Sequence, residues 1–413
     1  MQKVIVGLSG GVDSSVAALI LKKKGYKVIG LFMHNWEEED SNNKCHWKED
    51  SIDAMLVAKQ LDIPFQIIEM KNEYKKYVIN YMFNEYRLGK TPNPDILCNR
   101  EIKFNVFLKK SLDLGADFIA TGHYVNKKKI VKNKKIIYRL LIGEDFNKDQ
   151  SYFLCQLTQY QLEKSLFPLG LLTKNQVRKI AVKYKLRNAH KKESQGLCFV
   201  GKVNFPNFLK KRIIPKKGEI ICINSNASLY NEKKIFFSKE EELFFLSRKI
   251  KYRKSDGKII GYHQGAYYFT KGQRKGIALG GYKKPLFVID TDVKENIVYI
   301  GMGKEHPGLY RKSLFIQEEN IHWIRKDLTL LDGEKMDVFC RIRYRQPLQK
   351  SKLYKIKKGM FIEFDRMQCS ITEGQFAVWY LGKELIGSGI ISIILYFIFL
   401  IKLNIFCIYK FIF

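Results

Sequence analysis

Two cysteines lie in loops whose neighbouring residues suit thiol chemistry. Cys98 ends the stretch TPNPDILC, in which two prolines stiffen the chain just before a predicted helix. The N-terminus of a helix stabilises a thiolate, the nucleophilic form, and Asp95 is near enough to act as a base or a metal ligand. Cys198 lies between glycines in the loop GLCFVG. A lone cysteine is most often a buried structural residue, but two of them in loops predict a pair that the fold brings together.

A turn rich in glycine and serine follows the first predicted strand. Residues 3–8 form an apolar run typical of a buried strand, residues 9–15 read SGGVDSS, and a helical pattern follows. Glycines let a ligand approach the backbone, and the first N–H groups of a helix attract anions. Asp13 is better suited to a place beside Mg²⁺ than to direct contact with phosphate. The turn lacks the Gly-Lys-Ser/Thr of a Walker A loop. Two interpretations of it stay open, an ordinary glycine-rich turn and a phosphate site of another kind.

Three further apolar runs predict strands that alternate with helices. They cover residues 28–33, 65–68 and 118–122. This alternation predicts a doubly wound, mostly parallel α/β sheet, in which ligands bind at the carboxyl ends of the strands. The SGGVDSS turn, Met33 and Gly122 all fall at such ends, so the sequence predicts one site there.

The pattern changes beyond about residue 212, where glycines separate short apolar runs. Among the strands that this spacing predicts are residues 265–269 and 338–344, and the region as a whole is expected to be barrel-like. The predicted organisation is an N-terminal α/β domain, a small central domain with a lysine-rich insertion of no assigned function, a C-terminal β-barrel and an apolar tail. These are residues 1–212, 213–303 (with the insertion at 224–258), 304–391 and 392–413.

The charge balance is strongly basic, with 73 Lys and Arg residues against 41 Asp and Glu residues and a net charge of +32. A partner rich in phosphate is the natural interpretation, nucleic acid before membrane, although an A/T-rich genome would also enrich lysine. Eight cysteines occur without a Cys-x-x-Cys pair, which argues against a structural zinc site.

The two ends of the sequence predict a cytoplasmic location. The first strand begins at residue 3, which leaves no room for a signal peptide, so a reducing cytoplasm is expected. The apolar tail is broken by Lys402 and Lys410 and is too short for a membrane helix, which needs about 20 apolar residues. A membrane partner is therefore not favoured, and read-through of a decayed stop codon is the preferred interpretation of the tail.

Long motifs in a consistent order resemble the MnmA family of tRNA-specific 2-thiouridylases, which belongs to the N-type ATP pyrophosphatase (PP-loop) superfamily. The SGGVDSS turn resembles the loop with which that superfamily cleaves ATP between its α and β phosphates. The other matching stretches are LFMHNW, GKTPNPDILCN, ATGHY, NKDQSYFL, GLCF, GQRKG and RYRQ, at residues 31–36, 89–99, 120–124, 147–154, 196–199, 272–276 and 343–346. The resemblance covers residues 1 to about 391 and implies an adenine nucleotide alpha hydrolase-like N-terminal domain.

The resemblance implies ATP-dependent 2-thiolation of the wobble uridine, position 34 of tRNA. ATP would convert the C2 oxygen of the base into an adenylate, and a cysteine persulfide would then deliver sulfur as AMP leaves. By position, Cys198 would carry the persulfide, received from an upstream sulfur carrier protein or cysteine desulfurase. Cys98 would be the nucleophile that completes transfer, by releasing sulfide or by closing a transient disulfide with Cys198. Asp95 would assist as a general acid or base.

The same resemblance assigns binding residues, with Mg²⁺ expected to accompany ATP. The positions that match the ATP site are Gly7, Leu8, Ser9, Gly10, Gly11, Val12, Asp13, Ser14, Met33 and Gly122. The positions that match contacts with tRNA or its target base are Asn93, Pro94, Asp95, His123, Lys148, Asp149, Gln150, Arg343, Tyr344 and Gln375. Arg343 and Tyr344 are expected to alternate on the strand predicted at residues 338–344, as a phosphate contact and a stacking ring.

Two other functions stay open at the level of sequence. An amidating synthetase, or another ligase with the same nucleotide fold, would need no pair of cysteines. A tRNA-binding protein without catalysis is the non-enzymatic alternative, and the presence of Asp13, Asp95, Cys98 and Cys198 argues against it.

Overall fold

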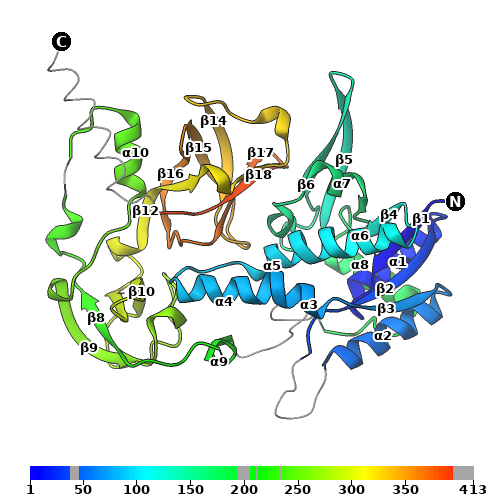
Figure 1. The fold of residues 1–413 in the computed structure, drawn as a ribbon, viewed down its shortest axis with the longest axis horizontal. Helices are drawn as coiled ribbons and strands as arrows, with labels where there is room; N and C mark the ends of the chain where they lie inside the picture. The colour runs from blue at the N-terminus through cyan, green and yellow to red at the C-terminus, as the bar shows by residue number, and fades with distance from the viewer. Residues whose placement is uncertain (38–45, 193–204, 211, 233, 394–413) are drawn as a thin grey trace.

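The computed structural model describes residues 1–37, 46–192, 205–210, 212–232 and 234–393 (Figure 1). Cys198 and residues 394–413 of the tail lie outside the described residues, so the predictions made for them stay predictions. Within the described residues, no helix is long and apolar enough to cross a membrane.

The N-terminal part contains a five-stranded parallel sheet with the strand order β3-β2-β1-β4-β7. Both of its faces are apolar, because Ile5 belongs to one buried cluster whereas Val4 and Val6 belong to another. This arrangement confirms the predicted doubly wound α/β fold. The strands are β1 (Lys3–Gly7), β2 (Lys27–His34), β3 (Phe65–Glu69), β4 (Phe118–Ala120) and β7 (Ser165–Leu166).

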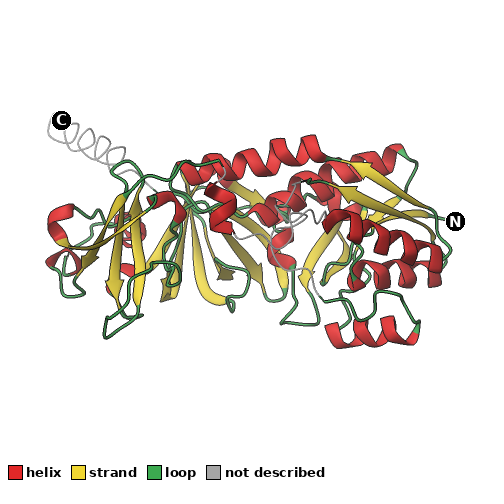
Figure 2. Cartoon of the chain, turned by 90° about the horizontal axis from the view of Figure 1, so that it is seen from below, coloured by secondary structure: helices red, strands yellow, loops and turns green. Residues whose placement is uncertain are grey.

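Helices cover both faces of this sheet, with α1, α2 and α8 on one side and the segments from α3 to α6 on the other. Figure 2 shows most of these helices at the end of the molecule that holds the N-terminus, and α4 extends from there to the middle of the molecule (Figure 1). The elements of the first side are α1 (Val12–Lys23), α2 (His46–Gln60) and α8 (Lys174–Lys183). Those of the second are α3 (Lys71–Tyr74), the π-helix η1 (Lys75–Ile79), α4 (Asn80–Arg87), α5 (Pro94–Leu97), the π-helix η2 (Cys98–Val106) and α6 (Phe107–Asp113).

The C-terminal strands form an antiparallel sheet that curves into a barrel. An isolated bridge between Phe315 and Ser392 joins its first strand to the residues that follow its last one. The strands are β12 (Tyr310–Gln317), β13 (Ile321–Trp323), β14 (Lys335–Arg341), β15 (Gln349–Ile356), β16 (Gly359–Cys369), β17 (Phe376–Leu381) and β18 (Glu384–Ile390). Arg343 and Tyr344 follow the end of β14, so the prediction that they alternate on a strand is wrong.

A hairpin from the N-terminal part extends the barrel sheet. Its strands are β5 (Val125–Lys132) and β6 (Lys135–Ile142), and β6 pairs with β18 through Leu140 and Leu385. The connection that follows contains the 3₁₀ segment η3 (Ser151–Leu154) and α7 (Gln159–Glu163). The N-terminal part and the barrel are thus joined by backbone pairing across one sheet.

The central part is a four-stranded sheet with the order β10-β11-β8-β9. Its strands are β8 (Gly218–Ile223), β9 (Gly257–His263), β10 (Leu286–Asp292) and β11 (Ile297–Met302), and its short 3₁₀ segments are η4 (Ser228–Tyr230), η5 (Lys254–Asp256) and η6 (Ala266–Tyr268). The remaining short elements are α9 (Phe205–Lys210), which precedes β8, η7 (Pro307–Leu309), which precedes β12, and η8 (Glu318–Asn320) and η9 (Lys326–Leu328), which flank β13. The strand predicted at residues 265–269 is wrong, because Gly265 has a φ of +142° and starts the 3₁₀ turn η6.

The lysine-rich insertion contains an ordered helix, α10 (Lys239–Ser247). Ser238 caps it by accepting a hydrogen bond from the Glu241 N–H. Phe244 packs in a buried cluster with Phe315 and Phe361 of the barrel. The sequence analysis assigned no helix to the insertion, because the burial of the apolar side chains of this helix depends on the barrel.

A buried ion pair joins the barrel to the N-terminal part. Arg341, at the end of β14, donates to the Asp149 carboxylate at 2.6 Å, to the Tyr380 hydroxyl at 2.7 Å and to the Ser151 hydroxyl at 2.9 Å. Asp149 also accepts the backbone N–H of Gly143 and of Ser151. Both charges are therefore paired and hydrogen-bonded inside the protein, as buried charges require.

Replacement of Arg341 tests this junction. We expect Arg341→Met to lower the free energy of unfolding by about 3–5 kcal/mol, because it leaves the Asp149 carboxylate buried without a counter-charge. Urea unfolding followed by circular dichroism measures the change. The control is Arg345→Met, which removes an exposed guanidinium four residues later in the chain. An equal loss in both variants would contradict the assigned role of the ion pair.

Candidate active site

The turn between β1 and α1 has the geometry of an anion site. Gly11 caps α1 without a side-chain acceptor, and among the described residues no acceptor pairs with the N–H groups of residues 10–14. Ser14 fixes the shape of the turn, because its hydroxyl donates to the Gly11 carbonyl at 3.1 Å and accepts the Ser9 N–H at 3.2 Å. Unpaired N–H groups at a helix start attract phosphate.

Glycines allow neighbouring elements to close around the turn. Gly10 has a φ of +73°, and a Cβ there would lie 2.3 Å from the Asp50 carbonyl oxygen. A Cβ at Gly122, just beyond β4, would lie 2.9 Å from the backbone of Asp13. Met33 at the end of β2 lies beside Gly7. The structure therefore brings the turn together with the ends of β2 and β4, while Leu8 and Val12 have their side chains in the core.

Asp13 is held by two residues that the sequence did not indicate. The ammonium of Lys174 in α8 lies 2.8 Å from each carboxylate oxygen of Asp13, and the Tyr124 hydroxyl donates to the same carboxylate at 2.6 Å. Lys174 is 8% exposed and Tyr124 is 2% exposed. A capping box at the start of α8 was visible in the sequence, but nothing in the sequence showed that this helix would face the turn.

The donor set fits a magnesium ion that arrives with a nucleotide. Within the described residues, no group of three or more His, Cys, Asp or Glu side chains could hold a metal by itself. Mg²⁺ commonly uses only one or two protein carboxylates together with substrate phosphates. Asp13 is the one acidic residue in the turn, so it is the residue that would share Mg²⁺ with ATP.

The proline-rich loop places Asp95 and Cys98 at the start of one helical segment. Asn93 caps α5 by accepting the Ile96 N–H at 3.2 Å, and Pro94 occupies the first helical position. Cys98 follows α5 and begins η2, so it lies in the second turn and not at the cap, and it is fully buried. The prediction that a helix N-terminus stabilises its thiolate is weakened, because the dipole acts mainly within the first turn.

Residues from both halves of the chain hold the proline-rich loop. The Gln375 side chain donates to the Thr91 carbonyl at 2.9 Å, and the Thr91 N–H donates to the Glu373 carbonyl at 2.9 Å. Asn99 donates to the Asp95 carbonyl at 3.0 Å. The barrel therefore positions the loop that carries Cys98. A sequence analysis that treats the domains as separate units does not predict this contact.

The segment 148–150 links the two predicted binding regions. Gln150 accepts the Tyr124 N–H at 3.0 Å, next to the tyrosine that contacts Asp13. Asp149 is 5% exposed and pairs with Arg341, so its side chain is committed inside the protein and is not presented for an RNA contact. Lys148 is partly exposed. Of these three residues, Lys148 is the one whose side chain suits a phosphate.

His123 is also enclosed, being 7% exposed. Its Nδ1 lies 2.8 Å from the Thr121 hydroxyl, and its ring is near those of Phe104 and Phe167. Burial, with a smaller contribution from Lys103, holds the pKa of His123 well below its usual range. The residue is therefore neutral in the folded protein at physiological pH.

The predicted contacts of the barrel lie in the turn after β14. Arg343 is exposed and donates to the carbonyls of Lys271 and Ser370. The Tyr344 ring lies 4.3 Å from that of Phe153 in η3. Arg343 thus adjoins segment 270–273 and Tyr344 adjoins segment 148–153, so the structure gathers this part of the predicted tRNA site even though it is not a strand.

A buried polar group beside Met33 was missed by the sequence reasoning. Asn35 is 1% exposed, and neither its amide nitrogen nor its oxygen has a hydrogen-bond partner among the described residues. His34 next to it stacks on Trp47 with 3.8 Å between ring centroids. An unpaired buried amide is costly, so its place at the carboxyl end of β2 suits a ligand contact. The LFMHNW motif was the available signal.

Three sequence profiles match the chain in the order of its structural parts. Residues 2–202 match a tRNA methyl transferase HUP domain, residues 241–302 a tRNA methyl transferase PRC-barrel domain, and residues 313–391 an aminomethyltransferase beta-barrel domain. Proteins named tRNA-specific 2-thiouridylase MnmA are similar over almost the whole chain. That of Flavobacterium johnsoniae is 56% identical over 395 residues, which cover 95% of this chain and 100% of that protein. The chain belongs to the MnmA family.

Further relatives with the same name agree with this assignment. The protein of Karelsulcia muelleri is 56% identical over 95% of this chain and 99% of its own length, and that of Halalkalibacterium halodurans is 41% identical over 95% of each. Solved structures align only in part. The U34-tRNA thiolase NcsA from Methanococcus maripaludis covers 51% of this chain and 64% of its own, at 18% identity and a TM-score of 0.31. This overlap is too limited to add to the assignment.

The low pKa of His123 predicts how stability depends on pH. Because folding lowers the pKa of this imidazole, the unfolded chain takes up its proton first as the pH falls below about 6.5. His123 should then cost about 1 kcal/mol of stability between pH 6.5 and 5.5, and none above pH 7.5. Urea midpoints of wild type and His123→Gln over this range measure the effect. An identical loss in both proteins would contradict it.

Proposed function

We propose that this protein catalyses ATP-dependent 2-thiolation of the wobble uridine of tRNA, giving 2-thiouridine, AMP and pyrophosphate. Membership of the MnmA family carries the proposal, since the relatives that share 95% of the chain are named for this reaction. The arrangement of the site supports it. Met33, beside the nucleotide turn, and Cys98 of the proline-rich loop both belong to the extended buried cluster that lies against the second face of the parallel sheet, which supports a nucleotide site and a thiol site in the same part of the protein.

Activation of the base is the first step. The C2 oxygen of uridine attacks the α phosphorus of ATP, the bond to the β-phosphate bridge breaks, and pyrophosphate leaves. The N–H groups of residues 10–14 and the start of α1 would hold the phosphates. Lys174 would offset the charge of Asp13 until Mg²⁺ enters with ATP. A carbonyl oxygen is a poor leaving group, and the adenylate converts it into AMP, a good one.

Sulfur transfer is the second step. The terminal sulfur of a persulfide on Cys198 bonds to C2 as AMP leaves, or Cys98 first displaces hydrosulfide that then attacks C2. In either route the Cys98 thiolate attacks the inner sulfur of Cys198, the S–S bond of the persulfide breaks, and a Cys98–Cys198 disulfide forms. An external thiol must reduce this disulfide before the next turnover. Asp95 would exchange the protons as general acid or base.

The partners follow from this chemistry. The target base must leave its stack to reach a buried thiol, and Asn93, Pro94 and Gln375 would frame it. A sulfur carrier protein or a cysteine desulfurase would supply the persulfide sulfur. A disulfide that is reduced in each cycle suits the reducing cytoplasm, which is the proposed location.

Nucleoside mass spectrometry tests the reaction and the roles of the cysteines. Unmodified tRNA, Mg-ATP and a sulfide source are incubated with wild type, Cys98→Ser and Cys198→Ser. We expect 2-thiouridine from wild type and a loss of at least 100-fold in both variants when a persulfide donor supplies the sulfur. Free sulfide should restore part of the activity to Cys198→Ser, because that residue only delivers sulfur.

The structural control for this experiment is Cys155→Ser. Cys155 is fully buried beside Ser388, it lies outside the loops that carry the predicted catalytic cysteines, and burial raises its thiol pKa to about 12, which disfavours the thiolate. Normal thiolation by Cys198→Ser with the persulfide donor would overturn the mechanism. Absence of product from wild type with tRNA bound would overturn the activity and favour a binding protein.

Lys174 gives a separate test of the nucleotide site. Lys174→Met leaves the Asp13 carboxylate without its counter-charge beside the expected phosphates. We expect kcat/KM for ATP in tRNA-dependent ATP–pyrophosphate exchange to fall about 10- to 100-fold, the range for a lost hydrogen bond to a charged group. Lys179→Met on the exposed side of the same helix is the control. Unchanged exchange would place ATP elsewhere.

A further inference from the structure

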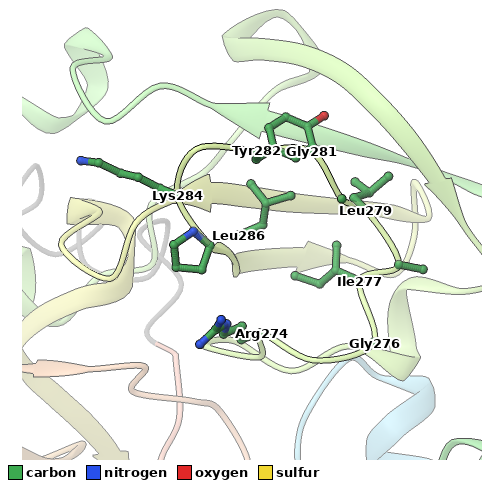
Figure 3. Close-up of a pocket in the computed structure, with 11 residues that line it drawn as sticks. Arg274, Gly276, Ile277, Leu279, Gly281, Tyr282, Lys284 and Leu286 are labelled. Atoms are coloured by element: carbon green, nitrogen blue, oxygen red, sulfur yellow. The ribbon is translucent and has the colours of Figure 1, made fainter.

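A pocket of about 380 Å³ lies in the central part of the protein, and residues of the segment 274–286 line it (Figure 3). The loop of residues 274–285 curves around it and leads into β10, whose first residue is Leu286 (Figure 3). Ile277 and Leu286 line it with buried apolar side chains, whereas most of the loop between them is exposed. The sequence motif GQRKG opens this loop, and the proposed reaction uses none of its residues.

The loop is basic and lacks acidic partners. Arg274 and Lys284 line the pocket, Lys275 and Lys283 adjoin them, and all four are exposed. None of the four forms an ion pair with any carboxylate in the described part of the chain. Other lysines of the central part are neutralised, as Lys249 is by Asp290 at 2.9 Å. Unneutralised cations gathered at one pocket attract an anion.

The backbone of the same loop offers hydrogen-bond donors. Across residues 274–284, no main-chain N–H has an acceptor among the residues that the structure describes. Gly280 and Gly281 face open space, since a Cβ on either would meet no atom within 4 Å. Exposed N–H groups in a glycine-rich loop form a concave anion site, and here cationic side chains surround them.

The base of the loop is fixed to the predicted tRNA site. The Thr270 hydroxyl lies 3.2 Å from that of Thr91 in the proline-rich loop, and Arg343 donates to the Lys271 carbonyl at 3.3 Å. Gly272 has a φ of +85° and donates to the Val288 carbonyl at 2.7 Å. The pocket is therefore held in a set position relative to Cys98 and to the turn after β14.

We propose that the loop of residues 274–285 binds a backbone phosphate of the tRNA substrate in this pocket. The inference rests on the proposed function and adds a positioning contact outside the site of chemistry. The cationic side chains and the N–H groups would receive the phosphate, and the apolar lining would take the adjoining ribose. Such a contact sets the register of the RNA without reading its sequence.

A charge placed in the pocket tests the proposal. Gly280→Asp adds a carboxylate into open space, and Gly280→Asn adds a neutral side chain of the same shape. We expect the aspartate variant to bind unmodified tRNA roughly tenfold more weakly than the asparagine variant, with an unchanged KM for ATP. Equal affinities for tRNA would overturn the proposal, and an effect on the KM for ATP alone would assign the pocket to a free nucleotide and overturn it too.

The salt dependence of binding supplies a second measurement. Arg274→Gln combined with Lys284→Gln should lower the slope of log K against log salt by about 2. The control, Lys59→Gln with Lys179→Gln, removes the same charge from exposed positions on α2 and α8 and should keep the wild-type slope. Equal slopes in both pairs would overturn the proposal. If the wild-type protein binds tRNA but forms no 2-thiouridine, the proposed function is overturned. The binding data would still show whether the pocket contacts a tRNA phosphate.

Discussion

The buried pair of Arg341 and Asp149 is the constraint on which the arrangement of the site depends. Asp149 comes from the segment that follows the β5–β6 hairpin, and Arg341 ends β14 of the barrel. An unpaired buried charge at either position would lower the free energy of unfolding by several kcal/mol. The ion pair therefore favours the one packing of the barrel on the N-terminal part in which both charges meet. Neighbours of the pair then occupy set positions. Gln150 holds the backbone of Tyr124, whose hydroxyl contacts Asp13, and Tyr344 packs on Phe153.

This linkage explains how a site for two different chemistries can be preorganised. The nucleotide turn depends on local geometry, because a strand, two glycines and a helix start leave N–H groups without partners. The proline-rich loop depends on distant support, since Gln375 and the residues beside it bind its backbone. The proposed transfer of sulfur to an adenylated base would require both parts to be in place together, and rigid positioning restricts the relative motion of barrel and loop that would otherwise oppose the reaction.

The strong positive charge is used unevenly over the molecule. Many lysines are neutralised by carboxylates, and Lys174 forms an ion pair with Asp13. Others, such as those of the loop at residues 274–285, have no acidic partner among the described residues, and Lys271, before this loop, accepts a hydrogen bond at its carbonyl from Arg343 in the turn after β14. An A/T-rich genome accounts for abundant lysine but not for cations that gather around a pocket with open N–H groups. The distribution, more than the total, favours a phosphate-rich partner.

The sequence by itself determined the α/β fold, the nucleotide turn and the proline-rich loop. The spacing of apolar residues and the backbone preferences of glycine and proline fix such features, because they act over a few residues. Only the tertiary structure decided which elements face each other. It buried Asp149 and His123, which motif matching had assigned to RNA, and it set Lys174 against Asp13. It also ordered α10 inside a segment whose pattern was weak. These outcomes depend on desolvation and on pairing between residues more than a hundred positions apart, and no local pattern records such contacts.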